Sequence, residues 1–315
     1  MKQKQFEADH AALWHDIAAI LDGSQPDQRA LPTLYRRLCQ SLALSRQRGY
    51  GPALADHLQS LVSQCHRRLY GTAIERPNTL LRWILVEFPR RVRSEWRLLL
   101  LACLVFFGIA VGIGLLVWYQ PHWAYSFASP SELARYRIMY QPGQAAIGRN
   151  GAQGDVMMFG FYIWHNVSIG FRTFAAGIFG GLPALLSLGL NGMHFGVIAG
   201  WLSKDPDTVG VFWSFAITHA SFEITGLLLS AMAGMRMGLA LIHPGPRSRG
   251  HALYATGHTM FPVIVGAAVL TVLAAFVEGF WSAAPQVSEH IKYAVGAVCW
   301  TLVIGFFTLA GRDHR

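Results

Sequence analysis

Residues 98–118 read LLLLACLVFFGIAVGIGLLVW, an uninterrupted run without a charged side chain. A helix needs about 20 apolar residues to cross the hydrocarbon core of a bilayer, so this run predicts a transmembrane helix. Arginines crowd the sequence before it, and Trp118 and Tyr119 close it, a pattern typical of a span that enters from the cytoplasm. The run therefore predicts an all-α, polytopic membrane protein whose N-terminus is cytoplasmic.

Five more apolar segments follow, over residues 157–179, 182–202, 209–242, 258–280 and 293–310. Six crossings of a bacterial inner membrane, with both termini in the cytoplasm, fit the charges, because the loop HPGPRSRGH (243–251) is basic. Five crossings with a re-entrant segment are the alternative, since only two glycines separate the second and third segments. The N-terminal MKQKQFEADHAALWHDI lacks a continuous apolar stretch, so no cleavable signal peptide is expected.

The composition divides the chain into three domains. Residues 1–76 carry three amphipathic patterns, over 4–22, 30–48 and 52–70, and predict a soluble cytoplasmic bundle of helices. Residues 77–97 alternate aromatic residues with arginines and predict an amphipathic elbow helix at the membrane surface. Residues 98–311 form the expected transmembrane domain. The arginines expected to meet lipid headgroups are Arg82, Arg90, Arg91, Arg93 and Arg97.

Composition also limits the classes of function. Only 14% of the residues are charged, too few to coat a soluble globule of 315 residues. The net charge of +9 follows from basic residues that flank apolar segments, so no nucleic-acid partner is expected. The sequence has no HExxH, GxSxG or paired-aspartate motif, so an enzyme, a metal and a cofactor are not expected. The expected partners are the lipid bilayer, other membrane proteins and, in a homo-oligomer, a second copy of the chain.

Small residues recur every four positions on several apolar segments. Such spacing lets helix backbones approach closely, and lipid supplies no hydrophobic drive for that approach. We therefore expect a closely packed bundle. The residues with this spacing are Gly108 and Gly112, then Gly192, Gly196 and Gly200, then Gly226, Ser230, Gly234 and Gly238.

Polar side chains interrupt the apolar segments and predict an internal cluster, because an ionisable group costs several kcal/mol in hydrocarbon. Its expected members are His165, Asn166, Arg172, Asn191, His219, Glu223 and Glu278. His219 and Glu223 are four residues apart and share one helix face. Counting along the helices predicts an Arg172–Glu223 ion pair and places Glu278 nearer the outside.

Three interpretations of the cluster remain open. It is a hydrogen-bonded network that fixes helix packing, or a path or site for a proton, an ion or a small solute, with His219 titrating near neutral pH. The third is a metal-dependent intramembrane hydrolase that uses His219 and Glu223.

Four segments together resemble the stage II sporulation protein M family: HNVSIGFRTFAAGIFGG (165–181), LLSLGLNGMHFG (185–196), THASFEITGLLLSAMAGMRMGLALIHPG (218–245) and AAFVEGF (274–280). The front end, with LALSRQRGYGPALADHLQSLV and RRLYG, is similar to the longer Gram-negative members. This chain has His165-Asn166 where members tend to have two asparagines, and His219-Ala220 where they tend to have His-Gly.

In spore formers the resemblance implies a membrane component of the septal peptidoglycan-degrading assembly, whose partners supply the hydrolase chemistry. Members in other bacteria have no such septum. The leading hypothesis is a non-enzymatic inner-membrane protein that organises a membrane or cell-envelope complex. A transporter or channel is the alternative, and the hydrolase comes third.

Overall fold

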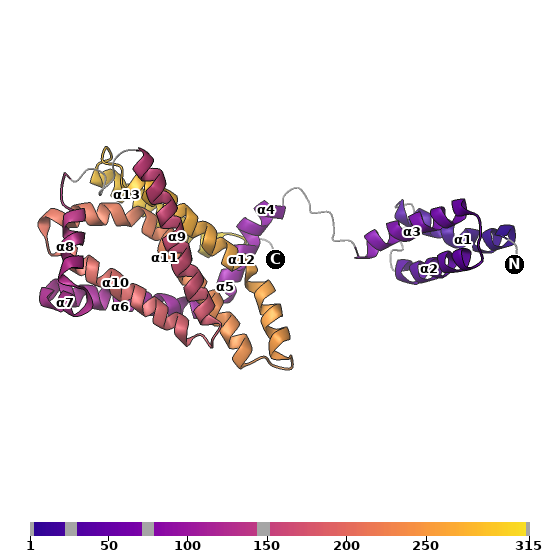
Figure 1. Ribbon diagram of the computed structural model, residues 1–315, viewed down its shortest axis with the longest axis horizontal. Coiled ribbons are helices and arrows are strands. Elements are labelled where there is room, and N and C mark those ends of the chain that lie inside the picture. The colour runs from indigo at the N-terminus through magenta and orange to yellow at the C-terminus, as the bar shows by residue number, and fades with distance from the viewer. Residues whose placement is uncertain (1–2, 23–29, 71–78, 144–151, 313–315) are drawn as a thin grey trace. The chain divides into compact units, whose positions relative to one another are not determined.

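The computed structural model describes residues 3–22, 30–70, 79–143 and 152–312, which are helical and contain no strand (Figure 1). The chain divides into two compact units, Met1–Thr79 and Leu80–Arg315. The all-α fold class predicted from the apolar segments is confirmed.

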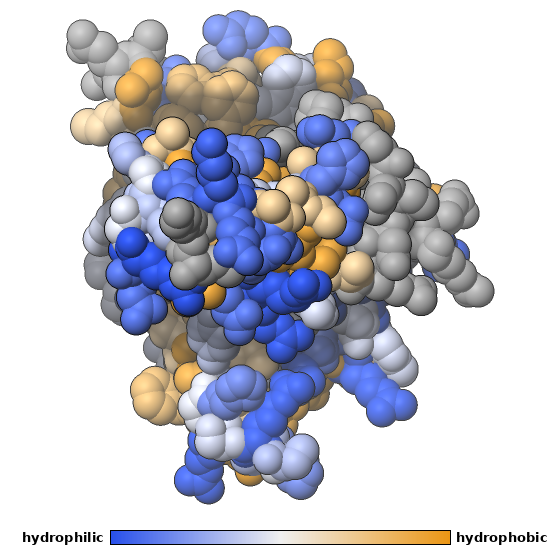
Figure 2. Space-filling model, turned by 90° about the vertical axis from the view of Figure 1, so that its right-hand side faces the viewer, coloured by the Kyte–Doolittle hydropathy of each residue, from blue (hydrophilic) through white to orange (hydrophobic). Residues whose placement is uncertain are grey.

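The N-terminal unit is a bundle of three amphipathic helices, α1 (Gln3–Leu21), α2 (Leu31–Gln47) and α3 (Pro52–Tyr70). One residue stripe of each helix is buried in a shared core, where Ile17, Leu38 and Leu58 have no exposed surface. Tyr70 is the one large hydrophobic side chain exposed among the described residues of this unit. Hydrophilic residues cover most of the surface of this unit seen in Figure 2, as expected for a bundle in water.

The second unit holds all the long apolar helices. It begins with α4 (Thr79–Arg82), the π-helix η2 (Trp83–Glu87), α5 (Phe88–Ser94) and α6 (Trp96–Tyr119). The short helices η3 (Pro121–Trp123), α7 (Ala124–Phe127) and α8 (Pro130–Met139) follow. The remaining elements are α9 (Ala152–Gly177), α10 (Leu182–Ser203), α11 (Pro206–Ile242), α12 (Arg249–Phe276), the π-helix η5 (Val277–Ser282) and α13 (Glu289–Leu309).

Five helices of the described part are long and apolar enough to cross a membrane: α6, α10, α11, α12 with η5, and α13. Their outward surfaces are apolar, as Leu104, Leu186 and Leu302 illustrate at 63%, 65% and 65% exposure. Helix α11 is the central helix. In its most apolar stretch 67% is buried, whereas 39% or less is buried in the corresponding stretch of each of the other four helices. An apolar exterior around buried helices is the arrangement expected of a membrane protein.

Helix α9 is not one of those five, yet it runs the full height of the unit without a break. Phe159, near its start, packs on Phe276 and Phe280 at the end of α12 and in η5. Gly177, its last residue, meets Gly234 near the end of α11. A re-entrant hairpin is therefore not formed within Ala152–Gly177.

The turn from α9 to α10 depends on two adjacent glycines. Gly180 and Gly181 have φ angles of 87° and 86°, a left-handed conformation that side chains with a Cβ rarely adopt. The chain thereby reverses direction within four residues and brings α10 back alongside α9. The tight turn expected from Gly180-Gly181 is present.

The elbow before α6 holds the end of α13. Arg93 donates hydrogen bonds to the carbonyl oxygens of Phe307 at 2.9 Å and Ala310 at 2.7 Å, which the helix itself leaves unpaired. Phe88 is buried against the rings of Phe306 and Phe307. The start of α6 and the end of α13 therefore lie side by side at one end of the unit.

Backbones touch along the contact of α6 with α10. A Cβ placed on Gly192, Gly196 or Gly200 would collide with the backbone carbonyl of Phe106, Ala110 or Gly114, respectively. Gly108 and Gly112, by contrast, face open space, so the packing role expected of these two glycines is wrong.

The small face of α11 meets two neighbouring helices. Gly234 and Gly238 lie against the backbone of α9, and Ser230 lies against Gly170 of the same helix. Gly226 lies against Thr271 of α12. Helix α11 is therefore held on two sides at backbone distance.

Candidate functional site

The site starts from two residues of the central helix. His219 and Glu223 are one turn apart on α11, and His219 Nε2 lies 3.8 Å from a carboxylate oxygen of Glu223. His219 is 7% exposed, whereas the Glu223 side chain keeps 34% of its surface accessible. The pair is therefore enclosed on the imidazole side and open on the side of Glu223.

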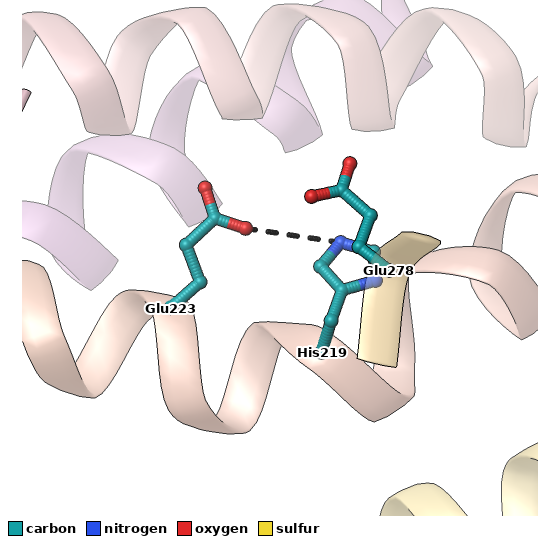
Figure 3. A group of neighbouring side chains, drawn as sticks. All are labelled: His219, Glu223 and Glu278. Carbon is teal, nitrogen blue, oxygen red and sulfur yellow. Dashed lines mark ion pairs between the residues drawn. The ribbon is translucent and has the colours of Figure 1, made fainter. Parts of the chain in front are cut away.

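Glu278 brings a second carboxylate from η5. One ligand atom from each of His219, Glu223 and Glu278 lies within 4.8 Å of the others, and the three side chains point toward one space (Figure 3). Glu278 is 8% exposed. The π-helix, with its wider turn, is a local distortion that often marks functional positions. We call these three residues the His–Glu–Glu cluster.

Glu278 was expected nearer the outside than His219, yet the two side chains meet. His219 lies about 20 Å along α11 from Pro206, whereas Glu278 is only about 6 Å before the end of η5. The two still meet, because α11 has 37 residues and begins well before the level at which η5 ends. Counting from the first apolar residue of a helix overestimates depth when the helix extends beyond the bilayer.

Ser282 orients the imidazole from its other side. Its hydroxyl lies 3.1 Å from His219 Nδ1 and 3.3 Å from the hydroxyl of Thr218. Lys292 donates a hydrogen bond to the backbone carbonyl of Ser282 at 2.8 Å, which attaches α13 to this turn. Because Nδ1 contacts Ser282, Nε2 is the nitrogen that faces the carboxylates.

Aromatic rings wall the cluster. Phe215 stands edge-on to the His219 ring, with centroids 5.0 Å apart, and Tyr140 packs on Phe215 at 5.8 Å. Burial raises the pKa of Tyr140, and the nearby carboxylates of Glu278 and Glu223 raise it further. The Tyr140 hydroxyl is therefore a neutral hydrogen-bond donor beside the acidic groups.

The other residues expected in the cluster lie elsewhere. The predicted Arg172–Glu223 ion pair is not formed: Arg172 is exposed on α9, and its Nε donates to the Ser168 carbonyl at 3.2 Å. His165 is also exposed and stacks on Phe161 of its own helix. Inward-facing α9 residues are instead Asn166, which is buried, and Thr173.

Asn191, an expected member of the cluster, bonds within its own helix. Its Nδ2 donates to the Ser187 carbonyl at 2.8 Å, and the Ser187 hydroxyl lies 2.6 Å from that of Thr173. These groups form a separate polar contact between α9 and α10. It is distinct from the His–Glu–Glu cluster.

The arginines of the elbow divide into two sets. Arg82, Arg90, Arg91 and Arg97 are exposed, while Arg93 is half-buried in its contact with α13. A further arginine, Arg236 of α11, pairs with Glu95 at 2.7 Å. Two cations of this end therefore serve internal contacts.

The sequence did not single out Ser282, Lys292 or Tyr140. Ser282 follows Glu278 by four residues, so the sequence could have predicted that the two share one helix face. Tyr140 lies outside the apolar segments and reaches the cluster only through tertiary packing.

An imidazole nitrogen with two carboxylates supports two kinds of chemistry. The three groups can share protons in a hydrogen-bonded network, or supply N and O ligands to a divalent cation. A histidine that binds a metal ion is usually oriented by a hydrogen bond at its other ring nitrogen, and Ser282 provides that contact for His219.

Comparisons with known proteins bear on both units. The family described as stage II sporulation protein M matches residues 102–283, more than half of the chain. A family described only as a domain of unknown function matches residues 4–71. No solved structure matches.

One curated relative is the uncharacterized protein MJ0793 of Methanocaldococcus jannaschii, 30% identical over 73 residues. The aligned part is 23% of this chain and 41% of the relative, so the chain spans less than half of that protein's length. The relative's name carries no activity. The match over residues 102–283 includes the His–Glu–Glu cluster and all of α9, and the chain belongs to the stage II sporulation protein M family.

Proposed function

We propose that this chain is a non-enzymatic inner-membrane protein that organises a cell-envelope complex by binding a membrane helix of a partner protein. The observation that carries the proposal is one face of α9, which we call the α9 outer face. Its residues are all exposed: Phe161, Trp164, His165, Phe171 and Arg172.

Two cationic or titratable side chains on this face are costly in lipid. His165 lies 12 residues before the end of α9, about 18 Å from it. Arg172 folds back along the helix to the Ser168 carbonyl and so points away from the nearer helix end. A charged side chain in the centre of the bilayer costs about 3 kcal/mol, which a polar partner would relieve.

The opposite face of α9 is firmly attached to the unit. Thr173 is fully buried and bonds Ser187 of α10, and Gly177 touches the backbone of α11. The glycine-lined contacts of α10 with α6 stiffen the same bundle. A rigid frame with a polar outward face suits a protein that positions another membrane helix.

Charge complementarity identifies the kind of partner. The Arg172 guanidinium, which lines the same hollow as Trp164 and Phe171, fits a helix that carries an aspartate or glutamate at the same depth, because Arg binds carboxylates in pairs of hydrogen bonds. The occupant we propose is one membrane helix of a different protein. The role inferred for family members in spore formers, within a multi-protein envelope assembly, is consistent with that occupant.

An inner-membrane location with both termini in the cytoplasm supports this role. The end of the unit where α6 begins and α13 ends carries exposed Arg82, Arg90, Arg91 and Arg97. Basic residues collect on the cytoplasmic side of membrane proteins. The α9 outer face would then lie within the inner membrane.

Photo-crosslinking in native membranes tests the proposal. A benzophenone side chain at Phe171 should give an adduct whose peptide maps to a membrane helix with a carboxylate. Arg172→Leu should lower the adduct yield at least fivefold. The matched control is the same probe at Leu302 of α13, which is 65% exposed against 66% for Phe171.

Two results would overturn the proposal. One is an equal yield of the same adducts from positions 171 and 302, or an adduct yield at position 171 that Arg172→Leu does not change. The other is an adduct with a second copy of this chain alone, which would show a homo-oligomer in place of a partner protein.

The transport alternative gains less from the geometry. A pathway needs polar groups in series across the bundle. Among the described residues, Arg172 and Asn191 each donate a hydrogen bond to a carbonyl of their own helix and do not join the His–Glu–Glu cluster. Proteoliposome flux that falls on Glu223→Gln would nevertheless favour transport over organisation.

A further inference from the structure

We infer that His219, Glu223 and Glu278 bind one divalent transition-metal ion of the zinc class. This inference is independent of the α9 outer face, which presents other residues. Three candidate ligand atoms already lie within 4.8 Å of one another, from two separate helical elements.

The spacing is that of a site ready to close on an ion. Zinc holds nitrogen and oxygen ligands at about 2.0–2.2 Å, so tetrahedral ligand atoms stand about 3.4 Å apart. The Nε2–carboxylate distance of 3.8 Å between His219 and Glu223 is close to that value. A side-chain rotation that moves the carboxylate oxygens by about 1 Å would complete the tetrahedral geometry. The fourth ligand position would be left for water.

The ligand types select the class of ion. One imidazole with two carboxylates is a mixed N and O set, which suits zinc, manganese or iron and offers no thiolate for softer ions. With its proton on Nδ1, His219 donates to the Ser282 hydroxyl and presents the Nε2 lone pair to the ion. The i, i+4 spacing keeps His219 and Glu223 on one face of α11 without strain.

The charge of the site also favours a dication. With both carboxyl groups ionised and the imidazole neutral, the three side chains would carry a charge of about −2, which is costly in a low-dielectric interior. His219 and Glu278 are more than nine-tenths buried, so water screens them little. A bound dication neutralises the two carboxylates and takes up ligand positions that would otherwise require shared protons.

Glu223 is the most accessible of the three proposed ligands. Its side chain retains 34% of its surface, whereas His219 is closed off by the ring of Phe215. Glu223 is therefore the first ligand that an entering ion meets. The aromatic wall keeps the imidazole in place as the ion binds.

The test measures metal directly on the full chain. Protein purified in detergent without a histidine tag is stripped with chelator, equilibrated with Zn²⁺, desalted and analysed by mass spectrometry for zinc. Wild type should retain about one zinc per chain that His219→Ala loses. Glu223→Gln and Glu278→Gln should each weaken Zn²⁺ binding at least tenfold, since both keep the side-chain shape but remove the charge.

Two controls separate this site from other histidines. His66→Ala in the N-terminal unit and His165→Ala on α9 should leave the retained zinc unchanged. Ser282→Ala should weaken binding about tenfold through the lost imidazole contact while the chain stays folded. Zinc should raise the melting temperature of wild type and of both histidine controls but not that of His219→Ala.

The inference is overturned if wild type retains less than about a tenth of an equivalent of zinc. It is also overturned if His219→Ala or Glu278→Gln, still monodisperse and folded, retains as much as wild type. Either result would assign the three groups to a proton-sharing network. Failure here would leave the photo-crosslinking result at Phe171 unaffected, so the two proposals fail separately.

Discussion

Helices α9 and α11 both carry ionisable residues in apolar sequence, but they place them on opposite sides. On α11, His219 and Glu223 turn inward and meet Glu278 of η5. On α9, His165 and Arg172 turn outward, while the inward stripe is made of small and hydroxyl residues such as Thr173. Hydropathy therefore locates polar residues along a span without telling which neighbour they face.

The largest effect is expected where α9 and α11 touch. Gly234→Leu inserts a side chain against the α9 backbone, where even a Cβ has no space, so the two helices must separate. We expect a loss of at least about 3 kcal/mol in the free energy of unfolding, measured by SDS titration in mixed micelles.

Gly108→Leu is the matched control for this substitution, because Gly108 faces open space on α6. It should leave the unfolding midpoint within error of wild type. Equal losses from Gly108→Leu and Gly234→Leu would mean that the α9–α11 backbone contact is absent.

A smaller effect separates the two faces of α9. Thr173→Val removes the buried hydroxyl that lies 2.6 Å from the half-buried hydroxyl of Ser187 and leaves Ser187 without this partner, a cost of about 1 kcal/mol. Ser168→Ala removes a hydroxyl that bonds only the Trp164 carbonyl of its own helix. Its unfolding free energy should stay near that of wild type. A greater loss of unfolding free energy than for Thr173→Val would mean that α9 turns its opposite face toward the bundle.

The start of α11 gives an effect of similar size with a defined pH dependence. Asp205 caps the helix by accepting from Asp207 N at 3.1 Å, and this bond, with the Arg137 ion pair, lowers the pKa of Asp205. Because the folded pKa lies below the unfolded value, the stabilisation is present above about pH 4 and is lost as pH falls further. Asp205→Ala should cost about 1 kcal/mol at pH 7 and clearly less at pH 3.

The Asp205 measurement compares wild type and Asp205→Ala by SDS titration at the two pH values. Glu87→Ala, which removes an exposed carboxyl of η2, controls for a general effect of acid on the micelles. A difference between wild type and Asp205→Ala that is the same at both pH values would contradict the capping role.

The smallest effect on stability is expected at Arg172. It has no ion pair with Glu223, so Arg172→Leu in purified protein should change the unfolding free energy by less than about 0.5 kcal/mol. An internal Arg–Glu pair, once broken, would instead cost about 3–5 kcal/mol. A loss of unfolding free energy in that range would mean that the Arg172–Glu223 ion pair expected from the sequence is formed.

Much of the fold was predictable because its signals are local. The apolar runs, the arginine-rich entry to α6, the amphipathic stripes of α1 to α3 and the Gly180-Gly181 turn each depend on a few neighbouring residues. The i, i+4 pair of His219 and Glu223 was predictable for the same reason.

The site was only partly predictable, because its other members depend on helix rotation and offset. Arg172 and Glu223 were matched by estimated depth, yet Arg172 lies on the far side of α9. Glu278 was expected nearer the outside than His219, and the two meet because α11 begins several turns before the level at which η5 ends, which hydropathy does not show. Tyr140 reaches the cluster from a loop with no apolar pattern of its own.

A cryo-electron microscopy map of the full chain in a lipid nanodisc most directly tests the opposed orientation of the two helices. We expect the carboxyl groups of Glu223 and Glu278 within about 5 Å of His219 Nε2, and Arg172 at the protein–lipid or protein–protein boundary. Density that shows Arg172 bonded to Glu223, or Glu278 turned away from His219, would contradict it.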